Sequence, residues 1–290
     1  MDPKNTLVVW HPGMLVRASA CKTAVAWFEK FGFSCVVIPP LFHQENAPHP
    51  YSGHPPPKGL ATVGLKEDTE ALLQRLQRDF PNRKLVFVGW SKGGIVVRKA
   101  AERIIQTKSH AIAGIVLLAP APQRGISIIH KRSVLKSFKS NLFWGILPRV
   151  WDCWRGCGTQ TFEEFAYSMG NKLTPEQCKK FYEQITWESK KAANQIAFPW
   201  LPWKGNPAAI QEASIDVPML FVSGDADPLV PQDIVLKEYK RHREALLRVG
   251  KNPQLITFLP APGHGHWLIG DEPKGEEVLE QIIEWILKIP

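Results

Sequence analysis

The chain contains few cysteines, and their number and spacing exclude a disulfide scaffold. Five occur in 290 residues, an odd number without regular spacing. They are Cys21, Cys35, Cys153, Cys157 and Cys178. Cys153 and Cys157 are not accompanied by a second cysteine or histidine pair at the spacing of a zinc site. We therefore expect reduced thiols, no metal ion and a cytoplasmic location.

Long apolar runs and basic clusters are absent as well. The run 112–121 is among the longest, whereas a membrane-spanning helix needs about 20 residues. Residues 1–5 are polar and lead into an apolar stretch too short for an export signal. The net charge of +9 comes from scattered lysines and arginines, without the basic stripe of a nucleic-acid surface. We expect no membrane span and no nucleic-acid partner, and nothing in the sequence indicates an oligomeric state.

Short β-branched runs alternate with longer stretches of helical period along most of the chain. This order is typical of an α/β protein in which helices cover both faces of a mostly parallel sheet. The six expected strands are 6–10, 35–38, 84–89, 113–118, 219–223 and 254–259. The five expected helices are 19–31, 65–80, 92–107, 232–249 and 275–288. Gly32 and Gly250 stand where two of these helices would end.

One long segment, 123–214, interrupts the alternation. It contains helical fragments and no convincing pair of strands, and it is rich in aromatic residues. These are Phe138, Phe143, Trp144, Trp151, Trp154, Phe162, Phe165, Trp187, Trp200 and Trp203. We predict a helical cap inserted into a core domain formed by residues 1–122 and 215–290. Its aromatic side chains would either roof an apolar pocket or pack the cap against the sheet.

A segment rich in proline and histidine, 39–59, is expected to form an irregular loop over the carboxyl edge of the sheet. It contains His43, His49 and His54. Because no carboxylates accompany them at a supporting spacing, we expect solvent-exposed histidines rather than metal ligands.

The pentapeptide Gly89-Trp90-Ser91-Lys92-Gly93 lies where an expected strand passes into an expected helix. In that context a Gly-x-Ser-x-Gly motif presents the serine hydroxyl in a sharp turn above the sheet. The two glycines leave room for the strand and the helix to cross closely. At the helix N-terminus, the helix dipole and the N–H of Lys92 would stabilise an oxyanion. A simple N-cap role for Ser91 is the alternative.

A serine nucleophile needs a base, and the base needs a carboxylate that orients it. Suitable residues follow the fifth and sixth expected strands, in the chain order serine, acid, histidine. The acid is Asp225 or Asp227, and the base is His264 or His266. We prefer Asp227 because it lies further into its loop. We prefer His266 because the apolar residues after it would seat the ring at the edge of the cap.

The loop after the first expected strand should supply a second oxyanion donor. Gly13 and Met14 are the candidates, through their backbone N–H groups. Trp90, directly before the serine, is expected to wall the substrate pocket. For the side chain of Lys92, contact with a substrate carboxylate is the alternative to the solvent-exposed position that we expect.

These residues resemble the α/β-hydrolase superfamily, and the resemblance covers nearly the whole chain. Residues 7–13 are similar to its first strand and oxyanion loop, 89–94 to its nucleophile turn and 224–227 to its acid turn. Residues 115–122 and 187–189 are similar to a subgroup of capped esterase- and lipase-like serine hydrolases. The resemblance implies the α/β-hydrolase fold and an esterase-like activity.

In that subgroup the catalytic histidine commonly follows a glycine and precedes apolar residues, which favours His266. The chain also departs from the usual pattern. Pro12 interrupts the common His-Gly of the oxyanion loop, and Trp90 and Lys92 replace the commoner neighbours of the serine. These departures concern the substrate rather than the fold.

The expected function is hydrolysis of a carboxylic ester or thioester of a lipophilic small molecule. The reaction would pass through an acyl-Ser91 intermediate, with His266 as base and then acid and Asp227 holding its tautomer, and it needs no cofactor. An alternative keeps the fold and these residues but performs acyl transfer, lyase or cyclisation chemistry. A second alternative is a non-catalytic ligand-binding protein of the same fold.

Overall fold

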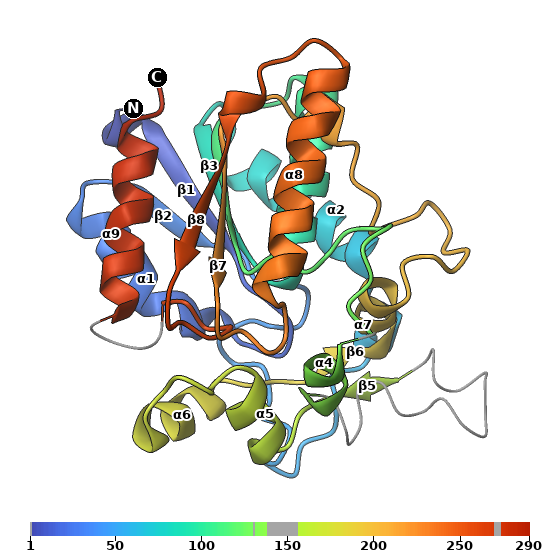
Figure 1. The fold of residues 1–290 in the computed structure, drawn as a ribbon. Helices are drawn as coiled ribbons and strands as arrows, with labels where there is room; N and C mark the ends of the chain where they lie inside the picture. The colour runs from blue at the N-terminus through green and yellow to red at the C-terminus, as the bar shows by residue number, and fades with distance from the viewer. Residues whose placement is uncertain (1, 130, 138–155, 270–273) are drawn as a thin grey trace.

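A six-stranded parallel sheet forms the centre of the molecule (Figure 1). The computed structural model describes residues 2–129, 131–137, 156–269 and 274–290. The strand order is β2-β1-β3-β4-β7-β8. The strands are β1 (Thr6–His11), β2 (Ser34–Val37), β3 (Lys84–Trp90), β4 (Ala111–Leu118), β7 (Met219–Gly224) and β8 (Ile256–Ala261). All six strands expected from the sequence are therefore confirmed, with small shifts at their ends.

Helices cover both faces of this sheet, as the sequence predicts. They are α1 (Lys22–Lys30), α2 (Leu65–Asp79), α3 (Lys92–Thr107), α8 (Gln232–Arg248) and α9 (Lys274–Leu287). In Figure 1, α1 and α9 lie on one side of the sheet and α2 and α8 on the other. The 3-10 turns are η1 (Pro3–Asn5), η2 (Ala18–Cys21), η3 (Leu60–Thr62), η4 (Glu212–Ser214) and η5 (Pro253–Leu255). The first predicted helix therefore begins as the 3-10 turn η2.

Two glycines end helices where the sequence predicts. Gly32 has φ +84° and Gly250 has φ +72°, left-handed conformations that favour glycine. Within the described part of the chain, no helix is both long and apolar enough to cross a membrane.

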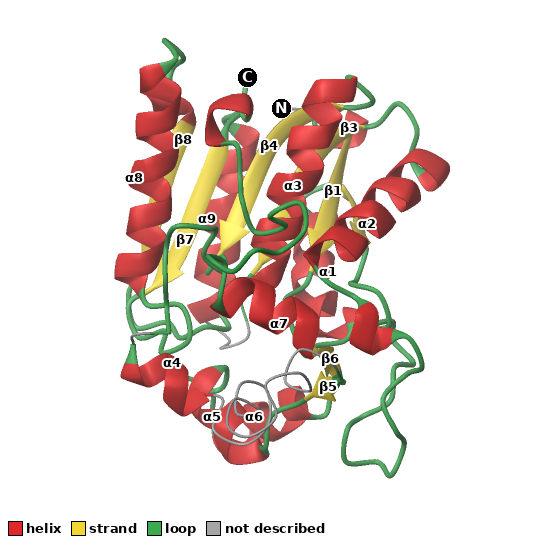
Figure 2. Ribbon diagram, turned by 90° about the vertical axis from the view of Figure 1, so that its right-hand side faces the viewer, coloured by secondary structure: helices red, strands yellow, loops and turns green. Residues whose placement is uncertain are grey.

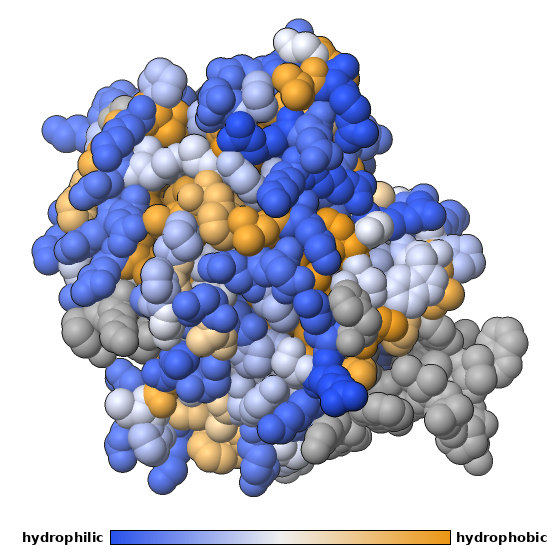
Figure 3. Space-filling view, in the orientation of Figure 1, coloured by the Kyte–Doolittle hydropathy of each residue, from blue (hydrophilic) through white to orange (hydrophobic). Residues whose placement is uncertain are grey.

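The inner strands of the sheet are buried on both sides, which explains their continuous apolar sequences. Every residue of β1 and of β7 is buried, because helices cover both faces of a parallel sheet. Behind β3, the buried Arg98 of α3 pairs with Glu238 of α8 and donates to the carbonyl of Gly94. On the face shown in Figure 3, hydrophilic residues dominate the surface, and apolar residues appear as separate patches.

In the described part of the segment between β4 and β7, helices and two short strands lie at the carboxyl edge of the sheet (Figure 2). Its elements are α4 (Arg132–Ser137), β5 (Cys157–Gly158), α5 (Phe162–Ser168), α6 (Pro175–Tyr182), β6 (Glu188–Ser189) and α7 (Lys190–Ala197). A helical insertion is confirmed, but the expectation of no strand pair is wrong, because β5 and β6 pair antiparallel. The limits 123–214 stay a prediction. Phe138, Phe143, Trp144, Trp151, Cys153 and Trp154 lie outside the described residues.

The strand order brings two loops together at the carboxyl edge. The chain leaves β1 toward β2 on one side, while β3 continues to β4 on the other. The last residue of β1, His11, is in register with Gly89 near the end of β3. Ligands of open α/β sheets bind at such a change of direction. The loops after β1 and β3 therefore mark the place for a functional site. The loops after β7 and β8 begin at the same edge of the sheet.

Candidate functional site

Ser91 occupies a strained turn between β3 and α3. Its φ of +53° and ψ of −120° lie outside the regions that non-glycine residues commonly adopt. Three backbone hydrogen bonds hold this conformation. Ser91 N–H donates to Leu118, and the carbonyl of Ser91 accepts from Gly94 and Ala121, each at 2.9 Å. Ser91 is buried at the N-terminus of α3, where the positive end of the helix dipole favours negative charge.

Tight packing around Ser91 leaves no room for a side chain at three of the nearby glycines. A Cβ atom at Gly93 would lie 2.1 Å from the carbonyl oxygen of His11. One at Gly89 would lie 2.6 Å from Val97 Cγ2. A Cβ at Gly13 would lie 3.0 Å from Ser91 Cβ, so the loop after β1 packs directly against the serine.

We expect the substitution Gly93→Ala to lower the free energy of unfolding by about 3 kcal/mol or more, the upper end of what overpacking costs. The new methyl group would meet backbone, which cannot move aside as a flexible side chain does. Urea unfolding measures the effect. Gly250→Asn is the control, since no atom lies within 4 Å of a Cβ there and asparagine tolerates a positive φ. Equal stability of the two variants would contradict this reading of the turn.

Asp227 and His266 form a buried pair at the ends of β7 and β8. Asp227 Oδ2 lies 2.8 Å from His266 Nδ1, and both side chains are fully buried. The other carboxylate oxygen, Oδ1, accepts from the N–H groups of Leu229 and Val230 at 2.8 and 2.9 Å. Among the described residues, His266 Nε2 has no hydrogen-bond partner. The imidazole is thus held at one nitrogen, and the other is available to a reacting group.

The alternative acid and base make different contacts. Asp225 is exposed, and its Oδ1 accepts from Gly263 N–H at 2.7 Å, so it ties the loop after β7 to the loop after β8. His264 is buried, and its Nδ1 lies 3.0 Å from the carbonyl oxygen of Pro262 in its own loop. The structure therefore brings Asp227 to His266, while Asp225 and His264 contact the surrounding backbone.

Trp90 links the Ser91 turn to the histidine loop. Its Nε1 donates to the carbonyl of His266 at 3.1 Å, and the centroids of the two rings are 5.4 Å apart. Trp267 lies on the other side, with centroid distances of 4.5 Å to Trp90 and 4.4 Å to Phe181 of α6. Trp90, Trp267 and Phe181 thus form an aromatic cluster that contacts His266 through Trp90. The role of Trp90 as a pocket wall stays a prediction.

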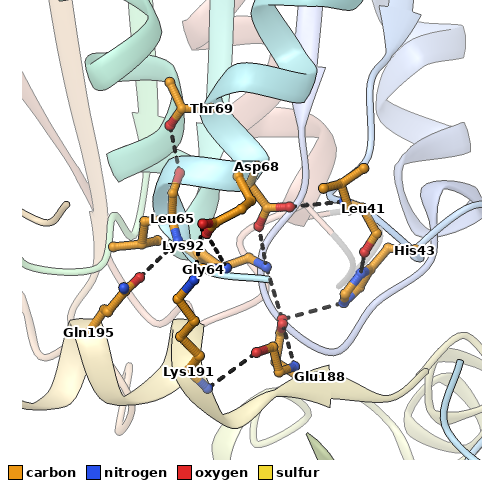
Figure 4. Close-up of polar contacts among 12 residues, drawn as sticks. Leu41, His43, Gly64, Leu65, Asp68, Thr69, Lys92, Glu188, Lys191 and Gln195 are labelled. Atoms are coloured by element: carbon orange, nitrogen blue, oxygen red, sulfur yellow. Dashed lines mark hydrogen bonds and ion pairs between the residues drawn. The ribbon is translucent and has the colours of Figure 1, made fainter. Parts of the chain in front are cut away.

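The expected solvent exposure of the Lys92 side chain is wrong. Lys92 is completely buried, and its Nζ lies 3.0 Å from both Asp68 Oδ2 and Glu188 Oε2 (Figure 4). Burial alone would lower the pKa of Lys92, but the charges of Asp68 and Glu188 outweigh it and raise this pKa above the ordinary value. The ammonium group is therefore bound within the protein and cannot hold a substrate carboxylate.

The expected exposure of His43 is wrong as well, whereas His54 is exposed as predicted. His43 Nε2 lies 3.3 Å from the Glu188 oxygen that also binds Lys92, and His43 Nδ1 lies 2.8 Å from the carbonyl of Leu41. Burial would raise the pKa of Glu188, but Lys92 and then His43 lower it to about 2. Sequence patterns missed this cluster of Asp68, Lys92, Glu188 and His43.

His11, at the end of β1, is another buried polar residue beside the site. Burial, together with the nearby charge of Lys92, lowers the pKa of His11 to about 3. Its imidazole is therefore neutral near pH 7. Within the described ranges, no group of three histidine, cysteine or acidic residues is arranged to hold a metal ion.

A cavity of about 630 Å³ lies between the start of α1 and α6. Trp267 and Phe181 form part of its wall, and the cationic Arg17 and Lys180 line it as well. Because its lining includes Trp267 but neither Ser91 nor His266, the cavity adjoins the histidine loop and stops short of the serine.

Comparison with solved structures supports the fold described above. Tomato methylketone synthase I in complex with 2-tridecanone matches with a TM-score of 0.67, 15% identity and 99% of each chain covered. A methylesterase from Arabidopsis matches with a TM-score of 0.62 and 12% identity, covering 97% of this chain and 99% of its own. An extracellular α/β-hydrolase from a Paenibacillus species gives 0.62 and 19%, with 96% and 98% covered. At these identities, the likeness establishes the fold alone.

The family relationship follows from the sequence itself. Comparison with curated proteins gives no match. Residues 7–273, however, match the family described as alpha/beta hydrolase fold. This span includes the loop after β1, the Ser91 turn and both loops that carry Asp227 and His266. The chain therefore belongs to the α/β-hydrolase fold family.

Proposed function

We propose that this protein is a serine hydrolase that cleaves a carboxylic ester or thioester of a lipophilic small molecule. Ser91 Oγ attacks the carbonyl carbon and forms an acyl-enzyme, which water then hydrolyses. His266 Nε2 accepts the serine proton and later delivers it to the leaving group. Asp227 holds the ring in the tautomer that this transfer requires.

The observation that carries the proposal is the buried contact between His266 and Asp227. A carboxylate fixed by two backbone N–H groups cannot turn away, so it orients the imidazole at 2.8 Å. Asp227 needs Nδ1 to carry a proton, which leaves Nε2 as the basic nitrogen. That nitrogen has no partner among the described residues, and the His266 loop packs through Trp90 onto the turn that contains Ser91.

The backbone around Ser91 supports an oxyanion hole for the tetrahedral intermediate. Lys92 N–H opens α3, and the loop with Gly13 and Met14 packs against the serine. We assign the two oxyanion donors to Lys92 and Met14, with Gly13 as the alternative to Met14. Each such donor is worth about 3 to 4 kcal/mol in the transition state.

Aromatic side chains support a lipophilic substrate. Trp90, Phe181 and Trp267 pack together beside His266 and offer an apolar surface. A cytoplasmic location is part of the proposal, since the cysteines of the described residues, Cys21, Cys35, Cys157 and Cys178, are all free thiols.

A non-hydrolytic reaction is the second candidate. The neighbours by fold include esterases and a methylketone synthase, so the same architecture accommodates more than one chemistry. An assay with a nitrophenyl ester distinguishes them. Efficient turnover with water alone supports hydrolysis, whereas turnover only with an added alcohol or amine acceptor supports acyl transfer.

The proposal is tested by labelling with a fluorophosphonate, which loses fluoride when a nucleophilic serine attacks its phosphorus. We expect the folded wild-type protein to become labelled and Ser91→Ala to remain unlabelled. Ser223→Ala is the matched control, since Ser223 is also buried at the carboxyl end of a strand. It should label like the wild type. Mass spectrometry of the intact and digested protein measures the adduct and its position.

Absence of labelling in the folded wild-type protein would overturn the catalytic assignment. It would favour the remaining alternative, a non-catalytic protein that holds a ligand in the same place. Labelling at a residue other than Ser91 would equally reject the proposed nucleophile.

A further inference from the structure

A buried charge cluster, which consists of Asp68, Lys92, Glu188 and His43, connects the two backbone segments that flank Ser91. These segments are the loop after β1 and the start of α3. Lys92 follows the serine, Asp68 comes from α2, and Glu188 comes from β6 of the inserted segment (Figure 4). The side chains of Lys92, Asp68 and Glu188 are all 0% exposed. The cluster therefore connects the core of the fold to its cap without access to water.

Glu188 holds the loop after β1 as well as Lys92. Its Oε2 accepts from Leu15 N–H at 3.3 Å, and Leu15 directly follows the proposed donor Met14. The carbonyl of Leu15 accepts from Thr186 N–H at 2.7 Å, two residues before Glu188. Both polar groups of the Leu15 backbone are thus fixed by the short segment 186–188, which leads into β6.

The backbone of Leu15 is strained. Its φ of +67° is rare for a residue with a branched side chain, and such conformations persist only where neighbouring groups enforce them. The flanking residue Val16 forms an antiparallel bridge with Ile185, which anchors the same loop to the cap. The enforced φ of Leu15 fixes the orientation of the peptide group that joins Met14 to Leu15. This peptide group lies next to the proposed donor, the N–H of Met14.

The side chain of Lys92 links the second proposed donor, the N–H of Lys92 itself, to the carboxylate of Glu188. Its own N–H starts α3, while its Nζ reaches Glu188 Oε2 and Asp68 Oδ2. Asp68 Oδ1 in turn accepts from Leu41 N–H at 2.9 Å. One oxygen of Glu188 thus contacts both the residue after Met14 and the side chain of Lys92.

Stability alone does not account for such a cluster. Bringing charges out of water is costly, and replacing a buried ion pair by apolar residues of similar size is often neutral or stabilising. A buried arrangement of fixed charges does, however, specify one geometry of the groups that it binds. Here those groups belong to the two segments that carry the oxyanion donors.

We propose that Glu188, Lys92 and Asp68 are positioning residues that align the Met14 and Lys92 N–H groups with the oxyanion of the intermediate. Because Glu188 belongs to the inserted cap, the position of the cap contributes to this alignment. This inference rests on the proposed function, since it concerns donors to an acyl-Ser91 intermediate. It assigns the side chain of Lys92 a role in positioning rather than in substrate binding.

Two substitutions of Glu188 test the proposal in a graded series. Glu188→Gln keeps the shape and an oxygen that accepts from Leu15 N–H, and Lys92 retains Asp68 as its partner. Glu188→Leu removes the acceptor. We expect kcat for a nitrophenyl ester to fall about 3- to 10-fold in the first variant and about 10- to 100-fold in the second. KM should stay within about twofold, because the donors act on the transition state.

The rate of fluorophosphonate labelling should fall in the same order, since the phosphoryl adduct uses the same donors. Lys191→Met is the matched control. Lys191 lies in α7 three residues from Glu188 and pairs with Glu67 at 3.0 Å, outside the cluster. Its kcat and labelling rate should equal those of the wild type. Thermal unfolding of each variant shows the folded fraction, to which the rates are normalised.

Rates at the wild-type value in both folded Glu188 variants, with only a lower Tm, would assign the cluster a structural role and overturn the proposal. If Glu188→Leu does not fold, Glu188→Gln decides alone: a slower labelling rate supports positioning, and an unchanged one rejects it. Failure of the wild type itself to label at Ser91 is a different result. It would reject the serine hydrolase function.

Discussion

Replacing His266 with alanine is expected to lower kcat for a nitrophenyl ester by about four to six orders of magnitude. The proposed base is then absent, and a serine hydroxyl at neutral pH is a weak nucleophile without one. His266 is the histidine that Asp227 holds at Nδ1. Steady-state kinetics of the purified variant, with circular dichroism as evidence of folding, measures the loss.

His264→Ala is the control for this prediction, because His264 lies in the same loop and is also buried. Its Nδ1 faces the carbonyl of Pro262, within the loop itself. We expect its kcat to change by less than about tenfold. A larger loss in His264→Ala than in His266→Ala would transfer the role of base to His264.

Asp227→Asn is expected to lower kcat by about four orders of magnitude while the fold remains intact. The N–H groups of Leu229 and Val230 need an acceptor, so the asparagine would direct its oxygen toward them. Its NH₂ group would then donate to His266 Nδ1. The proton of the imidazole would move to Nε2, and that nitrogen could no longer accept a proton from Ser91.

Asp225→Asn is the matched variant. Asp225 accepts a hydrogen bond from Gly263 N–H, and an asparagine oxygen at this exposed position accepts it equally well. We expect a loss of less than about tenfold, read from the same assay. If Asp225→Asn lost activity and Asp227→Asn retained it, the assignment of the acid would be reversed.

The sheet and its covering helices were predictable because their sequence signals are local. Buried parallel strands are continuous β-branched runs, and amphipathic helices repeat every three to four residues. Both signals placed all six strands and the five helices of the core. The pair of β5 and β6 was missed because each strand has two residues, too few for a pattern.

The position of Ser91 was also predictable, since a Gly-x-Ser-x-Gly motif between strand and helix is a local feature. The proximity of Asp227 to His266 followed from topology. Each residue lies in a loop that follows a strand of the parallel sheet, so both lie at the carboxyl edge. Which aspartate meets which histidine depends on loop conformation, and the sequence left both pairs open. The backbone hydrogen bonds of Leu229 and Val230, which fix Asp227, have no sequence signature.

The buried cluster around Lys92 could not be read from the sequence, because its members are far apart in the chain. A lysine normally keeps its ammonium group in water, so an exposed side chain was the reasonable expectation. One signal was present nevertheless. Asp68 lies on the apolar face of α2, at helical spacing from Leu65, Leu72 and Leu76. A carboxylate at a core position of an amphipathic helix indicates a buried cationic partner.

The contact between Glu188 and the core bears on protein engineering. Exchanging the cap of a serine hydrolase for that of a relative is a direct route to a new substrate range, provided that the cap is an independent module. In this chain it is not, because Glu188 supplies half of the counter-charge of Lys92 and the acceptor for Leu15. A transplanted cap without a carboxylate at the position of Glu188 would leave the N–H of Leu15 without its acceptor. A functional chimera must therefore transfer the β6 carboxylate together with the helices around it.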